Sequence, residues 1–72
     1  MLKAGIIGYG TIGKHIAELI QSHQAGAIEL KSVLVRNLER IEESSQHPFS
    51  FTNNEESFFN QDLDIVIEAA GH

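Results

Sequence analysis

Short apolar runs recur along the chain, and most of the segments between them carry apolar positions at helical spacing. Near-continuous runs occupy residues 2–7 and 63–70, while residues 28–35 alternate with polar positions before becoming wholly apolar. Such runs are typical of parallel strands that are covered on both faces of a sheet. They predict three buried strands, and residues 49–52 predict a further short one.

The longest segment between two strands predicts an amphipathic helix. It begins at Thr11 and runs to about His23, and Gly26 is expected to follow it in a left-handed conformation. Its apolar positions form one stripe that we expect to face the core. That stripe comprises Ile12, Ile16, Leu19 and Ile20.

Two shorter helices are predicted in the second half of the chain. Residues 38–45 predict one of them, and residues 55–61 predict the other. Asn53 or Asn54 is expected to cap the latter, because a short polar side chain can accept a hydrogen bond from the first turn. Its core-facing residues are expected to be Phe58 and Phe59.

Alternation of strands and helices predicts an α/β fold with a doubly wound parallel sheet. The expected spatial order of the strands is 3-2-1-4, the N-terminal half of a Rossmann-type sheet. The direction of the connections then reverses between the first and fourth strands, and ligands of such sheets bind outside the carboxyl ends of the strands at that point. We therefore expect a crevice between residues 8–13 and residues 69–72.

The first strand leads into the helix through the pattern Gly-x-Gly-x-x-Gly, formed by Gly8, Gly10 and Gly13. Gly8 would allow a tight turn, Gly10 would let a pyrophosphate approach the backbone, and Gly13 would let the helix pack closely on the strand. The free N–H groups that open the helix favour phosphate. The plainer alternative is a glycine-rich turn that binds nothing.

The end of the second strand indicates which dinucleotide is preferred. An acid there accepts hydrogen bonds from the ribose 2′-hydroxyl of NAD, whereas an arginine accommodates the 2′-phosphate of NADP. Arg36 and Asn37 occupy this position, with Arg40 one turn later. The sequence thus predicts that NADP is accepted, alone or beside NAD. The alternative is that Arg36 is an ordinary solvated surface residue.

Composition and charge exclude several classes of function. The chain has 72 residues, which is one domain at most, and a net charge of −5, which argues against binding of nucleic acid or an anionic membrane. It lacks cysteine, so it has neither disulfides nor thiolate chemistry, and a cytoplasmic location is expected. Neither a signal peptide nor a membrane-spanning run is found.

Isolated titratable residues indicate no further chemistry. His15, His23 and His47 are expected at the surface, and their spacing suggests no metal site. Glu68 would either face the crevice near a ribose or simply reach solvent. His72 is not assigned a catalytic role.

The final predicted strand is followed by only two residues. A central strand needs neighbours on both sides, so we expect an N-terminal part of a longer protein without its substrate domain. By itself this part is expected to show no dehydrogenase activity. An open sheet edge would also allow association into a homo-oligomer.

Two stretches resemble a known group of enzymes. Residues 3–13 look like the opening of NAD(P)-dependent dehydrogenases related to homoserine dehydrogenase, and residues 66–72 are similar to the corresponding segment of L-aspartate dehydrogenases. The resemblance implies a longer enzyme that oxidises the amino acid L-aspartate with NAD or NADP, its catalytic residues lying outside this chain. It also implies the cofactor-binding positions Gly8, Gly10, Thr11, Ile12, Gly13, Ala69, Ala70 and Gly71.

Three alternatives remain open at this point. One is another dehydrogenase of the homoserine dehydrogenase type, and a second is a non-catalytic module that senses dinucleotides. The third is an S-adenosylmethionine-dependent methyltransferase, which the glycine spacing disfavours. Arg36 departs from a purely NAD-type pattern and mildly disfavours the sensing module, which usually keeps an acid there.

Overall fold

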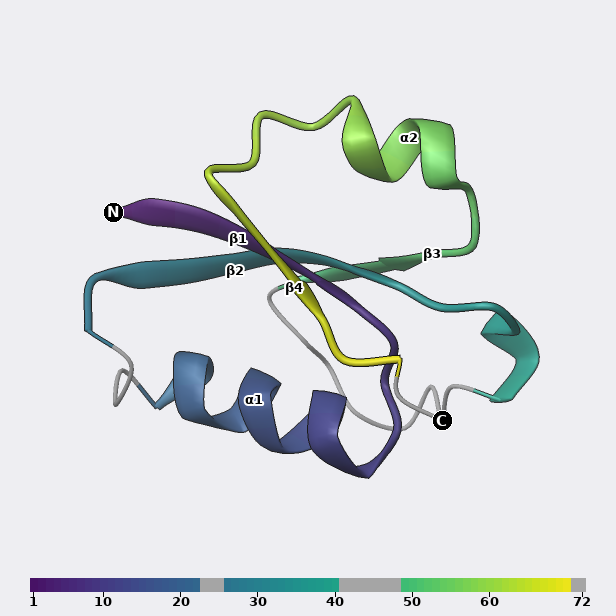
Figure 1. Ribbon diagram of the computed structural model, residues 1–72, viewed down its shortest axis with the longest axis horizontal. Coiled ribbons are helices and arrows are strands. Elements are labelled where there is room, and N and C mark those ends of the chain that lie inside the picture. Colours follow the sequence, from purple (N-terminus) through teal and green to yellow (C-terminus); the bar gives the residue numbers. More distant parts are fainter. Residues whose placement is uncertain (23–25, 41–48, 71–72) are drawn as a thin grey trace.

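The computed structural model describes residues 1–22, 26–40 and 49–70, and it has a parallel sheet with a helix on each face (Figure 1). The strand order β3-β2-β1-β4 confirms the predicted order 3-2-1-4. The elements along the chain are β1 (Leu2–Ile7), α1 (Thr11–Gln21), β2 (Ile28–Leu34), the 3₁₀ turn η1 (Leu38–Arg40), β3 (Ser50–Thr52), α2 (Glu55–Phe59) and β4 (Ile65–Glu68).

Hydrogen bonds extend the pairing of β1 and β4 beyond the ends of the shorter strand. The N–H of Asp64 donates to the carbonyl of Lys3 at 2.8 Å, and the N–H of Ala69 donates to the carbonyl of Ile7, also at 2.8 Å. The carboxylate of Asp64 accepts a further bond from the N–H of Lys3 at 2.8 Å. These bonds fix the register of β4, although the regular strand is shorter than the predicted residues 63–70.

One face of the sheet packs against α1 and carries the main core. Ala4 and Ile6 of β1 point to this face together with Leu30 and Val33 of β2. The core members are Ala4, Ile6, Ala17, Ile20, Leu30, Val33, Val35 and Phe49. The predicted stripe of α1 was wrong at its first position, because Ile12 is 63% exposed whereas Gly13 and Ala17 are buried.

The opposite face of the sheet packs against α2. Phe58 is fully buried there and lies over Gly5, where an added Cβ would come within 2.7 Å of both Phe58 and Leu63. The absence of a side chain at Gly5 thus makes room for the ring. Phe59 was expected near the core as well, but it is 56% exposed because its side chain leaves the short helix in another direction.

The ends of the helices differ from the sequence-based bounds. α1 ends at Gln21, with Ser22 as its C-cap, and residues 23–25 lie outside the described part. Gly26 has φ +89°, which confirms the left-handed conformation expected of it. Asn54 caps α2, its side-chain oxygen accepting from the N–H of Ser57 at 2.9 Å.

The predicted helix over residues 38–45 is described only at its start, where a single 3₁₀ turn forms. The rest of that prediction lies outside the described residues. In the part of the chain that the structure covers, neither α1 nor α2 has the length and apolar character that a membrane crossing demands.

Candidate functional site

The carboxyl ends of three strands meet at the loop between β1 and α1. The N–H of Gly8 donates to the carbonyl of Leu34 at 2.8 Å, which joins the loop to the end of β2. On the other side, the bond from Ala69 to Ile7 holds the end of β4 against the end of β1. The two predicted sides of the crevice, residues 8–13 and residues 69–70, are therefore brought together; Gly71 and His72 lie outside the described part.

Gly8 is required both by its backbone conformation and by its neighbours. Its φ is +98°, a backbone angle that residues other than glycine rarely adopt. An added Cβ would also lie 2.6 Å from the Cα of Ala70 and 2.8 Å from its backbone nitrogen. The tight turn was predicted from the sequence, but the close passage of residues 69–70 over Gly8 was not.

Gly13 and Gly10 differ in what surrounds them. A Cβ at Gly13 would overlap the carbonyl oxygen of Gly8, so the start of α1 can lie this close to the loop because this position has no side chain. Gly10 has φ −81°, which any residue can adopt, and a Cβ there would meet nothing within 4 Å. Gly13 is therefore needed for packing, whereas Gly10 leaves open space in front of the helix.

The N-terminus of α1 has neither a side-chain cap nor an acidic residue to offset its positive potential. Its N-cap is Gly10, which supplies no side-chain hydrogen bond, and the first turn holds no acidic residue. The first N–H groups of a helix have no partner within the helix, and the helix dipole adds positive potential at this end. Thr11 and Ile12 are both exposed in this turn, so their N–H groups border the open space. The arrangement can accept an anion such as phosphate.

Arg36 and Asn37 follow β2 on the same edge of the sheet. The N–H of Val35 still pairs with β3, donating to the carbonyl of Thr52 at 2.8 Å, and the chain leaves the sheet immediately afterwards. Arg36 is exposed and forms no ion pair with any residue that the structure describes. The side-chain oxygen of Asn37 accepts from the N–H of Glu39 at 3.1 Å, so this oxygen is committed to the 3₁₀ turn.

At the end of β4 the carboxylate of Glu68 turns back onto its own chain. Its Oε1 accepts from the N–H of Ala70 at 2.8 Å. Glu68 is exposed, as the prediction that it reaches solvent requires, and it also stabilises the turn that carries Ala69 and Ala70 past Gly8. Ala69 packs against the core on the α1 side, and Ala70 is exposed.

Tyr9 was missed by the sequence analysis. Its ring lies 4.9 Å from that of Phe51 and 6.4 Å from that of Phe49, and the Nζ of Lys14 lies 5.8 Å from its centre. Burial raises the pKa of the phenol above its ordinary value, and the charge of Glu18 raises it further. An aromatic residue between two glycines was the available signal, but its partners are some forty positions away in the sequence.

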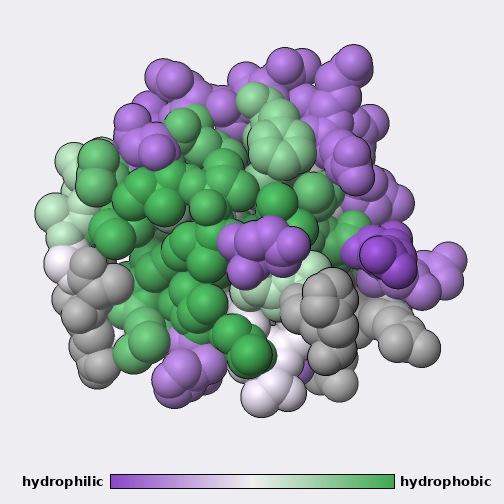
Figure 2. Space-filling view, in the orientation of Figure 1, coloured by the Kyte–Doolittle hydropathy of each residue, from purple (hydrophilic) through white to green (hydrophobic). Residues whose placement is uncertain are grey.

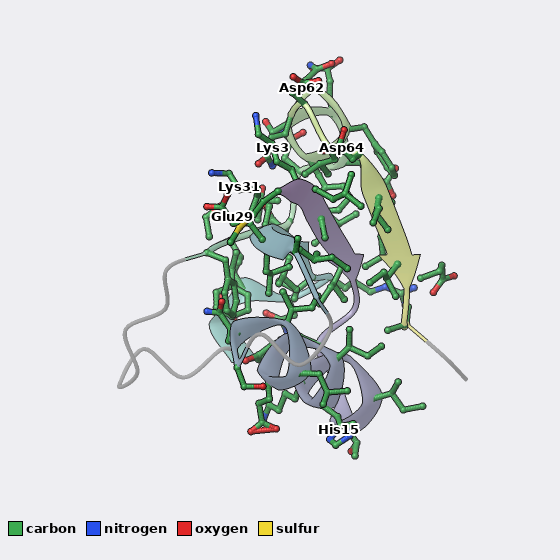
Figure 3. All side chains as sticks on the ribbon, turned by 90° about the vertical axis from the view of Figure 1, so that its left-hand side faces the viewer. Lys3, His15, Glu29, Lys31, Asp62 and Asp64 are labelled. Carbon is green, nitrogen blue, oxygen red and sulfur yellow. The ribbon has the colours of Figure 1, made fainter. Side chains whose placement is uncertain are left out.

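One group of charged side chains lies at the other end of the sheet. Figure 3 shows this group where β1 and β4 begin, away from the carboxyl edge, and it comprises Lys3, Glu29, Lys31, Asp62 and Asp64. His15 lies on α1, whereas His23 and His47 are outside the described residues. Among the residues that can be described, no three His, Asp or Glu side chains are grouped so as to hold a metal ion. The side chain of Arg40 also lies outside the described part.

Much of the surface around β4 is apolar. In the orientation of Figure 1, β4 passes in front of β1, and Figure 2 shows a broad hydrophobic area on this side of the molecule. Val66 of β4 is 42% exposed. The carboxyl edge also offers open space at Gly10, at the start of α1.

Comparison with known proteins identifies relatives of this arrangement. The family model described as "Homoserine dehydrogenase, NAD binding domain" matches residues 8–72. A homoserine dehydrogenase of Helicobacter pylori is 31% identical over 78 residues, which cover 97% of this chain and 18% of that protein. The crystal structures of homoserine dehydrogenase from S. aureus at pH 7.5 and pH 6.0 superpose with TM-scores of 0.67 and 0.65 at 29% identity, covering 93% of this chain and 19% of theirs.

This chain therefore spans about a fifth of the length of the relatives that it matches. The match begins at the glycine loop and includes the end of β4, the two segments that line the site. The resemblance to enzymes of the homoserine dehydrogenase type is confirmed, and the chain belongs to the family of homoserine dehydrogenase NAD-binding domains.

Proposed function

We propose that this chain is the dinucleotide-binding domain of an NAD(P)-dependent dehydrogenase. The observation that carries the proposal is the open space at Gly10 in front of an uncapped helix, between two glycines at which an added Cβ would overlap backbone atoms. A pyrophosphate needs such an approach to free backbone N–H groups. Its binding positions would be Gly8, Gly10, Thr11, Ile12 and Gly13, with Ala69, Ala70 and Gly71 on the other side.

Calorimetric titration of the purified chain with NADP, and separately with NAD, tests this proposal. We expect saturable binding of at least one of the two dinucleotides, and S-adenosylmethionine should not compete for the site. A chain that is folded by circular dichroism but binds neither would contradict the proposal. The bound nicotinamide would supply the hydride chemistry, while the protein's part is to bind and orient it.

Arg36 is proposed to favour NADP over NAD. Its guanidinium is exposed just beyond the carboxyl end of β2, and no described acidic side chain pairs with it. A guanidinium can bind a 2′-phosphate through charge-assisted hydrogen bonds worth about 1.5–3 kcal/mol, less where water screens the contact. Asn37 lies beside Arg36 at the proposed ribose site, but its side-chain oxygen already accepts the N–H of Glu39. Asn37 would therefore contribute to dinucleotide binding through its position and not through this oxygen.

The variant Arg36→Ala should weaken NADP binding by roughly tenfold while NAD binding changes little, because about 1.4 kcal/mol corresponds to a factor of ten. Arg36→Lys is the matched control, since it keeps the charge and loses the forked geometry. The NADP affinity of Arg36→Lys should lie between those of the wild type and Arg36→Ala. An unchanged ratio of NADP to NAD affinity in Arg36→Ala would assign Arg36 to the solvated surface instead.

The substrate of the whole enzyme is proposed from its relatives. Both named relatives are homoserine dehydrogenases, which favours oxidation of the homoserine hydroxyl. The alternative is L-aspartate, which rests on the similarity of residues 66–72 to L-aspartate dehydrogenases. We propose that the substrate-binding and catalytic groups lie outside this chain. The whole enzyme is proposed to be cytoplasmic and able to form a homo-oligomer.

An assay of the full-length enzyme distinguishes the two substrates. Oxidation of homoserine forms NAD(P)H without releasing ammonia, whereas oxidation of L-aspartate gives an imine that hydrolyses to oxaloacetate and ammonia. We expect NAD(P)H formation with homoserine, and ammonia-coupled turnover of L-aspartate would reverse this ranking. The 72-residue chain alone serves as the control and should be inactive with both.

A further inference from the structure

We propose that Tyr9 is a positioning residue that holds the phosphate-binding loop in its binding conformation by anchoring it to β3. This inference rests on the proposed dinucleotide function. It assigns to Tyr9 an effect on cofactor affinity that arises from packing alone. The loop meant here comprises Gly8, Tyr9 and Gly10.

The anchor is a cluster of three aromatic rings. Tyr9 meets Phe51 edge to face, with centroids 4.9 Å apart and an interplanar angle of 77°. Phe49 lies 6.4 Å from Tyr9 and 5.2 Å from Phe51, so each ring contacts the other two. These separations and tilts are those that aromatic pairs prefer. Phe49 is only 6% exposed and belongs to the main core, so the cluster is fixed on its inner side.

A second contact ties Tyr9 to α1. The Nζ of Lys14 lies 5.8 Å from the centre of the Tyr9 ring, within the range of a cation–π interaction. Lys14 also donates its backbone N–H to the carbonyl of Gly10 at 2.9 Å. The side chain of Tyr9 therefore sits between β3 and the first turn of the helix that would receive the phosphates.

The composition of the loop explains why this anchor matters. Gly8 and Gly10 have the largest backbone freedom of any residue type, and neither can pack a side chain against the core. Tyr9 is the only residue of the loop that can do so. A loop that is already ordered loses less entropy when a ligand binds, and the ligand binds more tightly for that reason.

Binding of NADPH, followed by its own fluorescence, tests the inference in three variants. Tyr9→Ala should weaken binding on the order of tenfold, whereas Tyr9→Phe keeps the ring and should stay within about twofold of wild type. Tyr9→Leu keeps a partly buried apolar side chain but removes the ring contacts with Phe49, Phe51 and Lys14, so it too should weaken binding, and it covers the case in which Tyr9→Ala does not fold. Unchanged affinity in Tyr9→Leu or Tyr9→Ala would overturn the proposal. So would a Tyr9→Phe variant as weak as Tyr9→Ala, because the hydroxyl would then be the active group.

Phe58→Leu is the matched control for stability. It trims an aromatic ring in the core on the opposite face of the sheet, where Phe58 lies over Gly5 of β1. This variant should lose stability without losing NADPH affinity. Equal losses of affinity in Phe58→Leu and Tyr9→Leu would mean that general destabilisation, rather than the anchor, weakens binding.

Hydrogen exchange in the absence of cofactor separates failure of this inference from failure of the proposed function. The amides to follow are those of Gly8 and Lys14, which hold the loop through bonds to Leu34 and Gly10. Both should exchange faster in Tyr9→Leu, while the amide of Ile6 in β1 stays protected. Unchanged exchange at both amides would refute the anchor. If wild-type protein bound no dinucleotide, the proposed function would fail, and exchange alone would decide whether Tyr9 orders the loop.

Discussion

Alanine substitutions at the three glycines of the loop should separate the glycines that shape the site from the one that receives the ligand. The three positions lie within six residues of one another, yet an added methyl group meets different surroundings at each. Gly8 and Gly13 face the backbone, and Gly10 faces open space. Gly8→Ala and Gly13→Ala should therefore lower the stability of the fold, whereas Gly10→Ala should lower the affinity for the dinucleotide and leave stability nearly unchanged.

Gly8→Ala should be the most destabilising of the three. A side chain at φ +98° costs about 1–2 kcal/mol, by analogy with the left-handed region. The new Cβ would also lie 2.6 Å from the Cα of Ala70, and relieving such an overlap with backbone costs about 1–3 kcal/mol. The total is roughly 2–5 kcal/mol. Domains have a free energy of unfolding of about 0.05–0.15 kcal/mol per residue, so this cost is a large part of the stability of a chain of this length.

Gly13→Ala should cost less than Gly8→Ala. It too would overlap backbone, at the carbonyl oxygen of Gly8, but its conformation is helical. Alanine favours a helix over glycine by about 1 kcal/mol, which offsets part of an overlap cost of about 1–3 kcal/mol. Gly10→Ala should change stability by less than about 0.5 kcal/mol, since the small preference for glycine at the cap and the gain from a stiffer unfolded chain nearly cancel.

Urea denaturation followed by circular dichroism, together with calorimetric titration with NADP, measures both quantities. Gly10→Ala should fold like wild type and bind NADP on the order of tenfold more weakly, because its methyl group would occupy the space for the pyrophosphate. Wild-type affinity in Gly10→Ala would refute the placement of the phosphates. Wild-type stability in Gly8→Ala would refute the close passage of residues 69–70.

Three further predictions concern stability. Ser32→Ala should stabilise the fold by about 1 kcal/mol in thermal unfolding, since the buried hydroxyl has no partner among the described residues, whereas Ser50→Ala at the exposed, paired position should be neutral. Asn54→Ala should cost about 1 kcal/mol through loss of the cap of α2, and an equal loss in Asn53→Ala would contradict that assignment. Folding raises the pKa of the Tyr9 phenol. The stability that this neutral phenol contributes should therefore be complete below about pH 10 and be lost as the pH rises through the folded pKa. A spectrophotometric titration in which the folded and the urea-unfolded chain share one midpoint would refute this.

Features encoded over a few neighbouring residues were predictable without the fold. The strand–glycine–helix sequence, the left-handed Gly26 and a cap at Asn53 or Asn54 each depend on local backbone preferences. The sheet order was also predictable, because crossovers between parallel strands are almost always right-handed and alternate segments must cover both faces. The chemistry proposed for Gly10 and for Arg36 follows from the same local patterns.

Other features depended on how elements distant in the sequence pack. A helical period shows which residues of α1 share a face. It does not show how the helix is rotated about its own axis, because that rotation depends on which residues let the helix approach the sheet most closely. That approach occurs at Gly13 and Ala17, so Ile12 turns outward to the site. The partners of Tyr9 are likewise supplied by β3, whose pairing with β2 brings Phe51 to the loop. Contacts of this kind arise from packing in three dimensions, which no local preference in the chain specifies.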